Sequence, residues 1–248
     1  MKFKKSLGQN LLIDKNISKK ILSLTTIKGK SVIEIGAGTG NLSIEILKLI
    51  PKKLICIEKD KIFAKNLKIL FKNEKSFSIV NGDILKLNLK KLLSEETIII
   101  GNLPYNISTQ ILIKFIRYNP WPPKFNKLIF MFQKEVAEKI IANLGSKYYS
   151  RLSIITKSRL KVINYFYVSK NCFFPKPKVD SIVIEFQPIK RKDTCFKSVK
   201  SLEYITNVFF SNKRKMINKT FKKLKIDNKE FLKKENIDLS LRPENLSE

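Results

Sequence analysis

Along most of the chain, short apolar runs alternate with segments whose apolar residues recur every three or four positions. The apolar runs predict strands at residues 31–36, 53–58, 77–83, 97–102, 127–133, 151–157 and 179–188. The periodic segments predict helices at residues 41–50, 61–73 and 134–144. This alternation favours an α/β fold with a mainly parallel sheet covered by helices on both faces.

The pattern changes after Ile189. Residues 190–197 are polar and charged, and the residues after them show helical periodicity without a further strand pattern. We therefore expect a sheet-containing domain at residues 1–189 and a small all-helical domain at residues 190–248.

The composition is strongly basic. Fifty Lys and Arg against 21 Asp and Glu give the 248-residue chain a formal net charge of +29, which favours a polyanionic partner such as nucleic acid. Lysines cluster between residues 212 and 234, where several would share a helix face and follow a phosphate backbone. Compositional drift toward lysine, isoleucine and asparagine is the alternative explanation of the total charge.

Several classes of chemistry are excluded. The chain has no histidine, so a histidine base, a histidine metal ligand and a Ser–His or Cys–His nucleophile are absent. The cysteines Cys56, Cys172 and Cys195 show no CxxC spacing and indicate reduced thiols. No signal-peptide pattern or apolar run of membrane-spanning length is seen. We expect a cytoplasmic protein without a membrane span or a bound metal.

Polar residues stand where the first three predicted strands end. The glycines Gly36 and Gly38 follow the first strand and would let a ligand approach the backbone, although their GxGxG spacing differs from the GxGxxG of dinucleotide enzymes. Glu58 ends the second strand, where an acid can bind both hydroxyls of a ribose. Asp83 ends the third strand and can accept a hydrogen bond from an adenine amino group.

These strand ends predict a pocket for a ligand that contains adenosine. Carboxylates in so basic a protein would suit a positively charged sulfonium, whereas a phosphate ligand would favour a lysine in the glycine loop, which has none. The pattern therefore favours S-adenosylmethionine over ATP or NAD.

The fourth strand ends in Asn102, Leu103, Pro104 and Tyr105. The Asn102 amide and the carbonyls of Leu103 and Pro104 would accept hydrogen bonds from an aromatic amine and favour a localised lone pair on its nitrogen. Tyr105 would stack on the base and align it for transfer. The alternative is a rigid loop whose ring only packs.

Together, these motifs resemble those of the ribosomal RNA adenine dimethyltransferases. The matching segments run in order through nearly the whole chain: KKSLGQNLL (4–12), EIGAGTGNLS, IEKD, NGDIL, GNLPYNIS, MFQKEVAEKI (131–140), KYYSRLSII (147–155), FFPKPKVDSIVI (173–184), FFSNKRKMINKTF (209–221) and LRPENLS (241–247).

The resemblance implies a Rossmann-like class I methyltransferase domain and a helical RNA-contact domain, which we expect to be shorter than in relatives. It implies transfer of methyl groups from S-adenosylmethionine to the exocyclic amines of two adjacent adenines near the 3′ end of small-subunit rRNA. The partner would be a pre-ribosomal particle, the protein a monomer, and small-subunit maturation its role.

By the same resemblance, one set of residues would bind the cofactor and another the target base. The cofactor set is Gln9, Asn10, Leu12, Gly36, Gly38, Glu58, Asp83 and Asn102. Asn102 would also contact the target base, and Phe173 would close the base pocket opposite Tyr105. Phe174 follows in a variable position of the motif, so either ring could be the one that stacks.

Two alternatives stay open at this point. One is a resistance-type methyltransferase that acts on large-subunit rRNA, although QKEVAEKI and YYSRLSII resemble the small-subunit enzymes more closely. The other is a non-catalytic RNA-binding factor of ribosome assembly, against which the intact Asn102 and Tyr105 argue. Leu11 also departs from the phenylalanine usual in the family, a volume change that we expect to be tolerated.

Overall fold

The structure is a computed structural model that describes residues 10–189, 198–213, 215–223, 233, 235 and 237–246. Contacts divide the chain into two compact units, one of Met1–Ala137 with Arg159–Asp193 and one of Glu138–Ser158 with Thr194–Glu248. The second unit therefore includes an internal segment as well as the C-terminal residues. The functional division at residue 189 stays a prediction.

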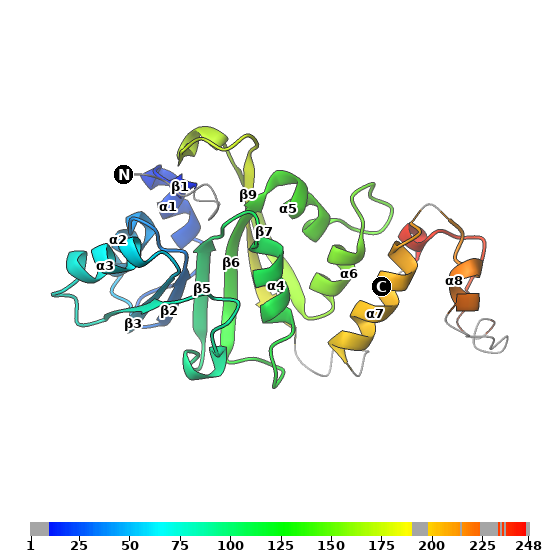
Figure 1. The fold of residues 1–248 in the computed structure, drawn as a ribbon, viewed down its shortest axis with the longest axis horizontal. Helices are drawn as coiled ribbons and strands as arrows, with labels where there is room; N and C mark the ends of the chain where they lie inside the picture. Colours follow the sequence, from blue (N-terminus) through cyan, green and yellow to red (C-terminus); the bar gives the residue numbers. More distant parts are fainter. Residues whose placement is uncertain are drawn as a thin grey trace. The chain divides into compact units, whose positions relative to one another are not determined.

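The first unit is built on a seven-stranded sheet of order β4-β3-β2-β5-β6-β9-β7 (Figure 1). Neighbouring strands from β4 to β6 pair in parallel, and β9 runs antiparallel to both β6 and β7. The predicted α/β fold with a mainly parallel sheet is confirmed. The strands are β2 (Ser31–Ile35), β3 (Lys53–Glu58), β4 (Phe77–Asn81), β5 (Thr97–Asn102), β6 (Phe125–Gln133), β7 (Leu160–Val168) and β9 (Ser181–Pro188).

Helices cover both faces of this sheet, and alternating residues of β6 pack against the helices of one face or the other. Ile129 and Met131 join the core formed with the first three helices, whereas Phe130 faces the fourth helix, with its ring centroid 5.6 Å from that of Phe115. The alternation follows from the period of two in a strand. The helices are α1 (Lys15–Leu22), α2 (Asn41–Lys48), α3 (Lys61–Leu70), α4 (Ser108–Ile116) and, at the junction with the second unit, α5 (Lys134–Ile141).

Two of these helices begin at aspartate caps. Asp14 accepts hydrogen bonds from the backbone of Asn16 and Ile17 at the start of α1, and Asp60 accepts one from Ile62 at the start of α3. These bonds satisfy amide groups that have no partner within the helix. Because Asp60 also follows the last residues of β3, its cap fixes the turn at the carboxyl end of that strand.

A separate two-stranded sheet attaches the N-terminal segment to the first unit. Strand β1 (Leu11–Leu12) pairs antiparallel with β8 (Phe173–Phe174), so that Leu12 lies opposite Phe173 and Leu11 opposite Phe174. The sequence pattern did not predict this pairing. It matters for the site because it places Asn10 and Leu11 near the sheet edge.

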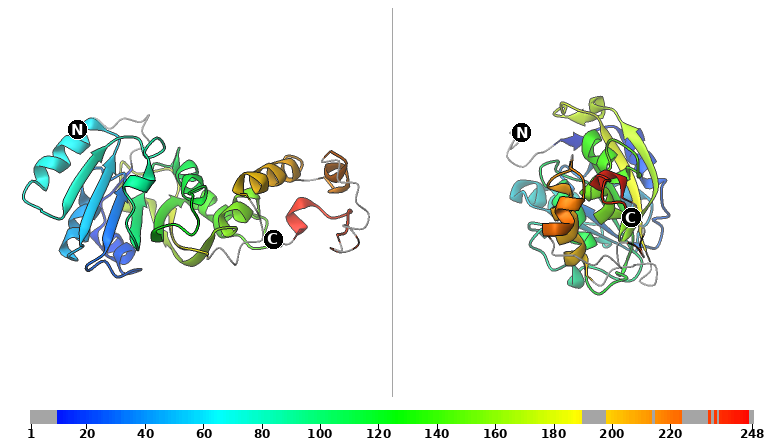
Figure 2. Two further views of the ribbon diagram at one scale, coloured as in Figure 1. Left: turned by 90° about the horizontal axis from the view of Figure 1, so that it is seen from below. Right: turned by 90° about the vertical axis from the view of Figure 1, so that its right-hand side faces the viewer.

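The second unit is helical in its described part (Figure 2). Its core contains Phe209, Ile217 and Phe221. The described helices that follow α5 are α6 (Arg151–Lys157), α7 (Val199–Phe210) and α8 (Asn218–Lys223), with a 3₁₀ turn at Pro243–Asn245.

One predicted element was wrong. Residues 151–157 form helix α6 rather than a strand, and Ser150 and Ser153 make a reciprocal capping box at its start. Helix α6 packs against α7, and Arg151 donates a hydrogen bond to Asn207 at 3.1 Å. A segment of seven residues with three apolar side chains, Leu152, Ile154 and Ile155, fits either structure, and packing against a distant helix decides between them.

Candidate functional site

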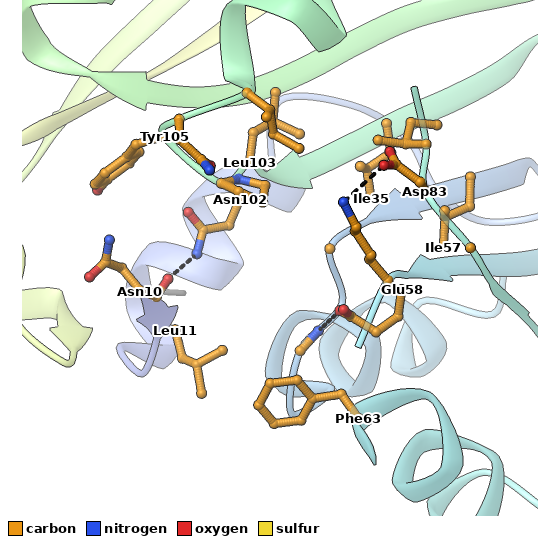
Figure 3. A pocket seen from close by; sticks show the side chains of 18 residues that line it. Asn10, Leu11, Ile35, Ile57, Glu58, Phe63, Asp83, Asn102, Leu103 and Tyr105 are labelled. Carbon is orange, nitrogen blue, oxygen red and sulfur yellow. Dashed lines mark hydrogen bonds and ion pairs between the residues drawn. The ribbon is translucent and has the colours of Figure 1, made fainter. Parts of the chain in front are cut away.

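A cleft opens at the carboxyl ends of β2, β3, β4 and β5, and the N-terminal segment forms a further wall (Figure 3). Nine predicted site residues line it: Asn10, Gly36, Gly38, Glu58, Asp83, Asn102, Leu103, Pro104 and Tyr105. Leu12 and Phe173 are buried in the core instead, and Gln9 lies outside the described residues. The parallel strands therefore bring together most of the residues that the sequence singled out.

The glycine loop after β2 lets other groups come close to its backbone. Gly36 and Gly38 have φ values of +74° and +53°, in the left-handed region that favours glycine. A Cβ atom on Gly38 would lie 2.7 Å from the side chain of Leu11, and one on Gly36 would lie 3.6 Å from the carbonyl oxygen of Asn102. A larger residue at position 38 would displace the side chain of Leu11 and would be strained by the positive φ.

Glu58 is held rigidly at the end of β3. One carboxylate oxygen accepts the backbone N–H of Gly38 at 2.9 Å, and the other accepts that of Asp60 at 2.8 Å. The residue is 7% exposed, and burial raises the pKa of its carboxyl although the backbone bonds oppose this. Each oxygen retains a lone pair, so Glu58 can accept further bonds from a ligand in the cleft.

Asp83 follows β4 and lies beside Ile57 and Glu58 at the cleft (Figure 3), and it is paired with Lys59, which follows Glu58 in the sequence. The Nζ atom of Lys59 lies 2.9 Å from Oδ2 of Asp83, and the backbone of Leu85 donates to Oδ1 at 2.9 Å. The hydrogen bond from Lys59 lowers the pKa of this carboxyl. The ion pair keeps an ionised acceptor at the cleft.

Asn102 ends β5 and points into the cleft toward Asn10 (Figure 3). Its side-chain Nδ2 donates to the backbone carbonyl of Asn10 at 2.8 Å. Because the amide nitrogen is used in this way, the orientation of the amide is fixed and its oxygen is left as an acceptor. The same bond attaches the N-terminal segment to the sheet.

The loop after Asn102 is also anchored. The carbonyl of Pro104 accepts the backbone N–H of Ile107 at 3.1 Å, and the Tyr105 hydroxyl shares a hydrogen bond of 2.7 Å with Ser181 Oγ at the start of β9. Burial raises the pKa of Tyr105, so the phenol stays neutral. Its ring is therefore a fixed, uncharged surface beside Asn102.

The two phenylalanines after Cys172 are in very different surroundings. Phe173 is 2% exposed and packs in the core with Leu12, whereas Phe174 is 57% exposed. Their pairing with β1 directs consecutive side chains to opposite sides. Phe174 is the ring that is accessible in this conformation.

The sequence interpretation missed several residues that line the cleft, among them Leu11, Lys59 and Phe63. Leu11 follows Asn10 directly, and Phe63 lies in the first turn of α3, on the buried side that the helical spacing indicated. The sequence gave no reason to select Lys59 as a site residue, because a lysine after a strand is usually solvated.

The described part of the chain contains no helix long and apolar enough to cross a membrane. Among the same residues, no group of three or more acidic or cysteine side chains is placed to hold a metal ion.

Comparison with known proteins decides the family. The sequence pattern of the family described as "Ribosomal RNA adenine dimethylase" matches residues 1–247. The chain belongs to the ribosomal RNA adenine dimethylase family. The predicted family and enzyme class, methyltransferase, are thereby confirmed.

Relatives of this dimethylase are similar over nearly their whole length. The "Ribosomal RNA small subunit methyltransferase A" of Pelagibacter ubique is 45% identical over 99% of this chain and 93% of its own. The protein of the same name from Azorhizobium caulinodans is 37% identical over 98% of this chain and 84% of its own.

Solved structures support the class I methyltransferase fold of this dimethylase. A dimethyladenosine transferase from Plasmodium falciparum is 28% identical and superposes with a TM-score of 0.78 over 95% of this chain and 92% of its own. The 23S rRNA methyltransferase ErmE superposes with a TM-score of 0.71 over 95% of this chain and 96% of its own, but at 21% identity it shows the fold alone. The relatives from Pelagibacter ubique and Azorhizobium caulinodans are named as small-subunit methyltransferases, so the alternative of a large-subunit enzyme is not favoured.

Proposed function

We propose that this dimethylase transfers methyl groups from S-adenosylmethionine to the exocyclic amines of two adjacent adenines near the 3′ end of small-subunit rRNA, within a pre-ribosomal particle. The observation that carries the proposal is the position of Asn102 and Tyr105 in the same cleft as Glu58 and Asp83. We further propose that it acts in the cytoplasm as a monomer, in small-subunit maturation.

The residues of the cleft suit S-adenosylmethionine. Glu58 offers lone pairs to the ribose hydroxyls, and Asp83 offers an acceptor to the adenine amine beside the apolar side chain of Ile84. The backbone of Gly36 and Gly38 would lie against the methionine portion. When bound, the cofactor supplies a methyl group on a positively charged sulfur, and that charge favours the ionised form of nearby carboxylates.

Asn102 would act on the target amine. With Nδ2 committed to the Asn10 carbonyl, Oδ1 is the atom that can accept a hydrogen from the adenine amino group. The carbonyl of Leu103 would accept the second hydrogen, and Pro104 would keep the turn stiff. Acceptors on both hydrogens favour a pyramidal nitrogen whose lone pair is directed at the methyl group.

Tyr105 would position the base. Its hydroxyl is held by Ser181, so the ring can stack on a purine with little loss of conformational freedom. Phe173 would close the pocket from the other side, a role that requires its buried ring to become uncovered. The basic second unit would contact RNA, with Lys215, Lys219 and Lys222 exposed among its described lysines.

Methyl transfer to purified ribosomal particles tests the proposal. The full-length protein, incubated with labelled S-adenosylmethionine and immature small subunits, should produce dimethyladenosine in small-subunit rRNA. Label in large-subunit rRNA would instead favour the resistance-type activity. Absence of transfer to either RNA, with cofactor binding retained, would favour a non-catalytic assembly factor.

A further inference from the structure

The side chain of Lys114 joins helix α4 to the loop that follows β4. Its Nζ atom donates hydrogen bonds to the backbone carbonyls of Leu85 and Leu87, each at 2.9 Å. Lys114 lies in the last turn of α4, and both carbonyls belong to the loop of residues 82–88, which leads from β4 to a 3₁₀ turn at Leu89–Lys91. One ammonium group therefore restrains a loop that is neither helix nor strand.

This loop carries two residues of the cofactor side of the cleft. Asp83 and Ile84 both line the cleft, and Ile84 is buried. Leu85 connects Asp83 to Lys114, because its N–H donates to Oδ1 of Asp83 at 2.9 Å and its carbonyl accepts from Nζ of Lys114. The position of the Asp83 carboxylate therefore depends on a turn that Lys114 holds.

The ammonium group of Lys114 is partly buried and lies near the charge of Asp83. Burial lowers the pKa of Lys114, and the Asp83 carboxylate opposes that effect. Hydrogen bonds from a charged donor are stronger than those between neutral groups. The two bonds to the loop therefore restrain it more firmly than a neutral side chain would.

The other end of α4 carries the loop of the proposed base site. Residues 102–107 line the cleft and lead directly into α4. The hydroxyl of Ser108 donates to the carbonyl of Tyr105 at 3.1 Å, and the backbone N–H of Ile111 donates to the carbonyl of Ile107 at 2.9 Å. Helix α4 is thus the rigid element between the base-site loop and the loop that Lys114 restrains.

We propose that Lys114 is a positioning residue that holds the loop of Asp83 and Ile84 in place before the cofactor binds. The inference rests on the proposed function, because it takes S-adenosylmethionine as the ligand of the cleft. A loop that is already ordered loses less conformational freedom when a ligand binds. Lys114 would therefore determine the affinity for the adenine part of the cofactor without touching it.

Calorimetric titration of the full-length protein with S-adenosylhomocysteine tests this role. Lys114→Met keeps an apolar stem without the ammonium group, and its affinity should be about tenfold lower, the loss expected for a hydrogen bond from a charged donor. Lys114→Arg keeps a charged donor and should recover most of the affinity. Gln110→Met, at an exposed residue one turn earlier on α4, is the control for substitution of this helix.

An analogue of S-adenosylhomocysteine with hydrogen in place of the 6-amino group separates positioning from a general loss of stability. The wild type should bind this analogue about tenfold more weakly than S-adenosylhomocysteine, because Asp83 loses its partner. In Lys114→Met the ratio should fall below about threefold, since Asp83 is no longer held in place. A variant that is only less stable would keep the wild-type ratio, because both ligands bind the same folded fraction.

The same titrations separate failure of this inference from failure of the proposed function. If the wild type binds S-adenosylhomocysteine and Lys114→Met shows the same affinity and the same ratio, the positioning role is wrong and the proposed function stands. If the wild type does not bind S-adenosylhomocysteine, both fail. A Lys114→Met variant that loses affinity for immature small subunits alone would overturn the inference in favour of direct contact with RNA. Lys114→Gln, whose side chain is one atom shorter, replaces Lys114→Met if that variant does not fold.

Discussion

The side chain of Asn102 donates a hydrogen bond to the backbone carbonyl of Asn10 at 2.8 Å, across 92 positions of the sequence. The bond joins the loop that ends β5 to the N-terminal segment. It leaves one amide oxygen pointing into the cleft, so a single side chain links the folding of the N-terminal segment to the proposed chemistry.

This relationship predicts two separable effects at position 102. Asn102→Ala should lower the rate of methyl transfer by about 100-fold or more, since one acceptor at the reacting amine is lost. Asn102→Ala also removes the donor to the Asn10 carbonyl and should free the N-terminal segment, whereas Asn102→Asp removes that donor but keeps an acceptor oxygen. Transfer kinetics check the first effect, and limited proteolysis of the N-terminal segment checks the second. Normal transfer by Asn102→Ala would exclude the proposed role.

Lys59 should govern how binding of the cofactor depends on pH. Its hydrogen bond lowers the pKa of Asp83, so that carboxyl stays ionised at pH values where an ordinary aspartate gains a proton. In the wild type, affinity for S-adenosylhomocysteine should persist as the pH falls, and it should be lost only as the pH passes through that lowered pKa. In Lys59→Ala the loss should begin at higher pH.

Calorimetric titrations at a series of pH values measure this difference. The neighbouring exposed Lys61 provides the control, because Lys61→Ala leaves the ion pair with Asp83 in place. Identical pH profiles for the wild type and Lys59→Ala would show that Asp83 does not bind the adenine amine.

Glu34 should make folding stability depend on pH. Burial raises its pKa from 4.5 to about 7, although Ser43 and Cys56 donate to its carboxylate. The folded protein therefore holds this proton more tightly than the unfolded chain. The resulting stabilisation is complete below pH 4.5 and is lost as the pH rises to about 7, a change of roughly 3 kcal/mol.

Urea unfolding at about pH 5 and about pH 8 measures this change. Glu34→Gln should remove most of the loss in the free energy of unfolding, because a glutamine has no proton to release. Glu45→Gln on α2 should not remove it, since Lys48 lowers the pKa of Glu45. If Glu34→Gln loses as much free energy of unfolding between these two pH values as the wild type does, the prediction is contradicted.

The two phenylalanines of β8 should differ in their effect on stability. Phe173→Ala leaves a cavity in the core and should cost about 3–5 kcal/mol, whereas Phe174→Ala should lower the free energy of unfolding by clearly less, because its side chain is largely exposed. If Phe173 also closes the base pocket, transfer should fall in Phe173→Leu at temperatures where the variant is folded, and persist in Phe174→Leu. Loss of transfer only in Phe174→Leu would assign the stacking ring to Phe174.

The carboxyl ends of the central strands could be predicted from the sequence alone. The predicted strand 53–58 matches β3, and 97–102 matches β5, so Glu58 and Asn102 were placed at one sheet edge. Parallel strands present their ends at the same edge whatever the details of packing. The left-handed turn at Gly36 and Gly38 follows equally from local chemistry.

Other features depend on contacts between distant residues. The predicted strand at 151–157 is a helix because α6 packs against α7. The ion pair of Lys59 with Asp83 requires two adjacent strand ends to lie at the right separation, which no single segment specifies.

The sequence by itself determined the order of the strands' polar ends, the positions that need glycine, and the absence of histidine chemistry, because each depends only on residue type and local periodicity. Only the tertiary structure decided which of Phe173 and Phe174 is buried. That outcome is set by strand register, and register depends on pairing between segments far apart in the chain.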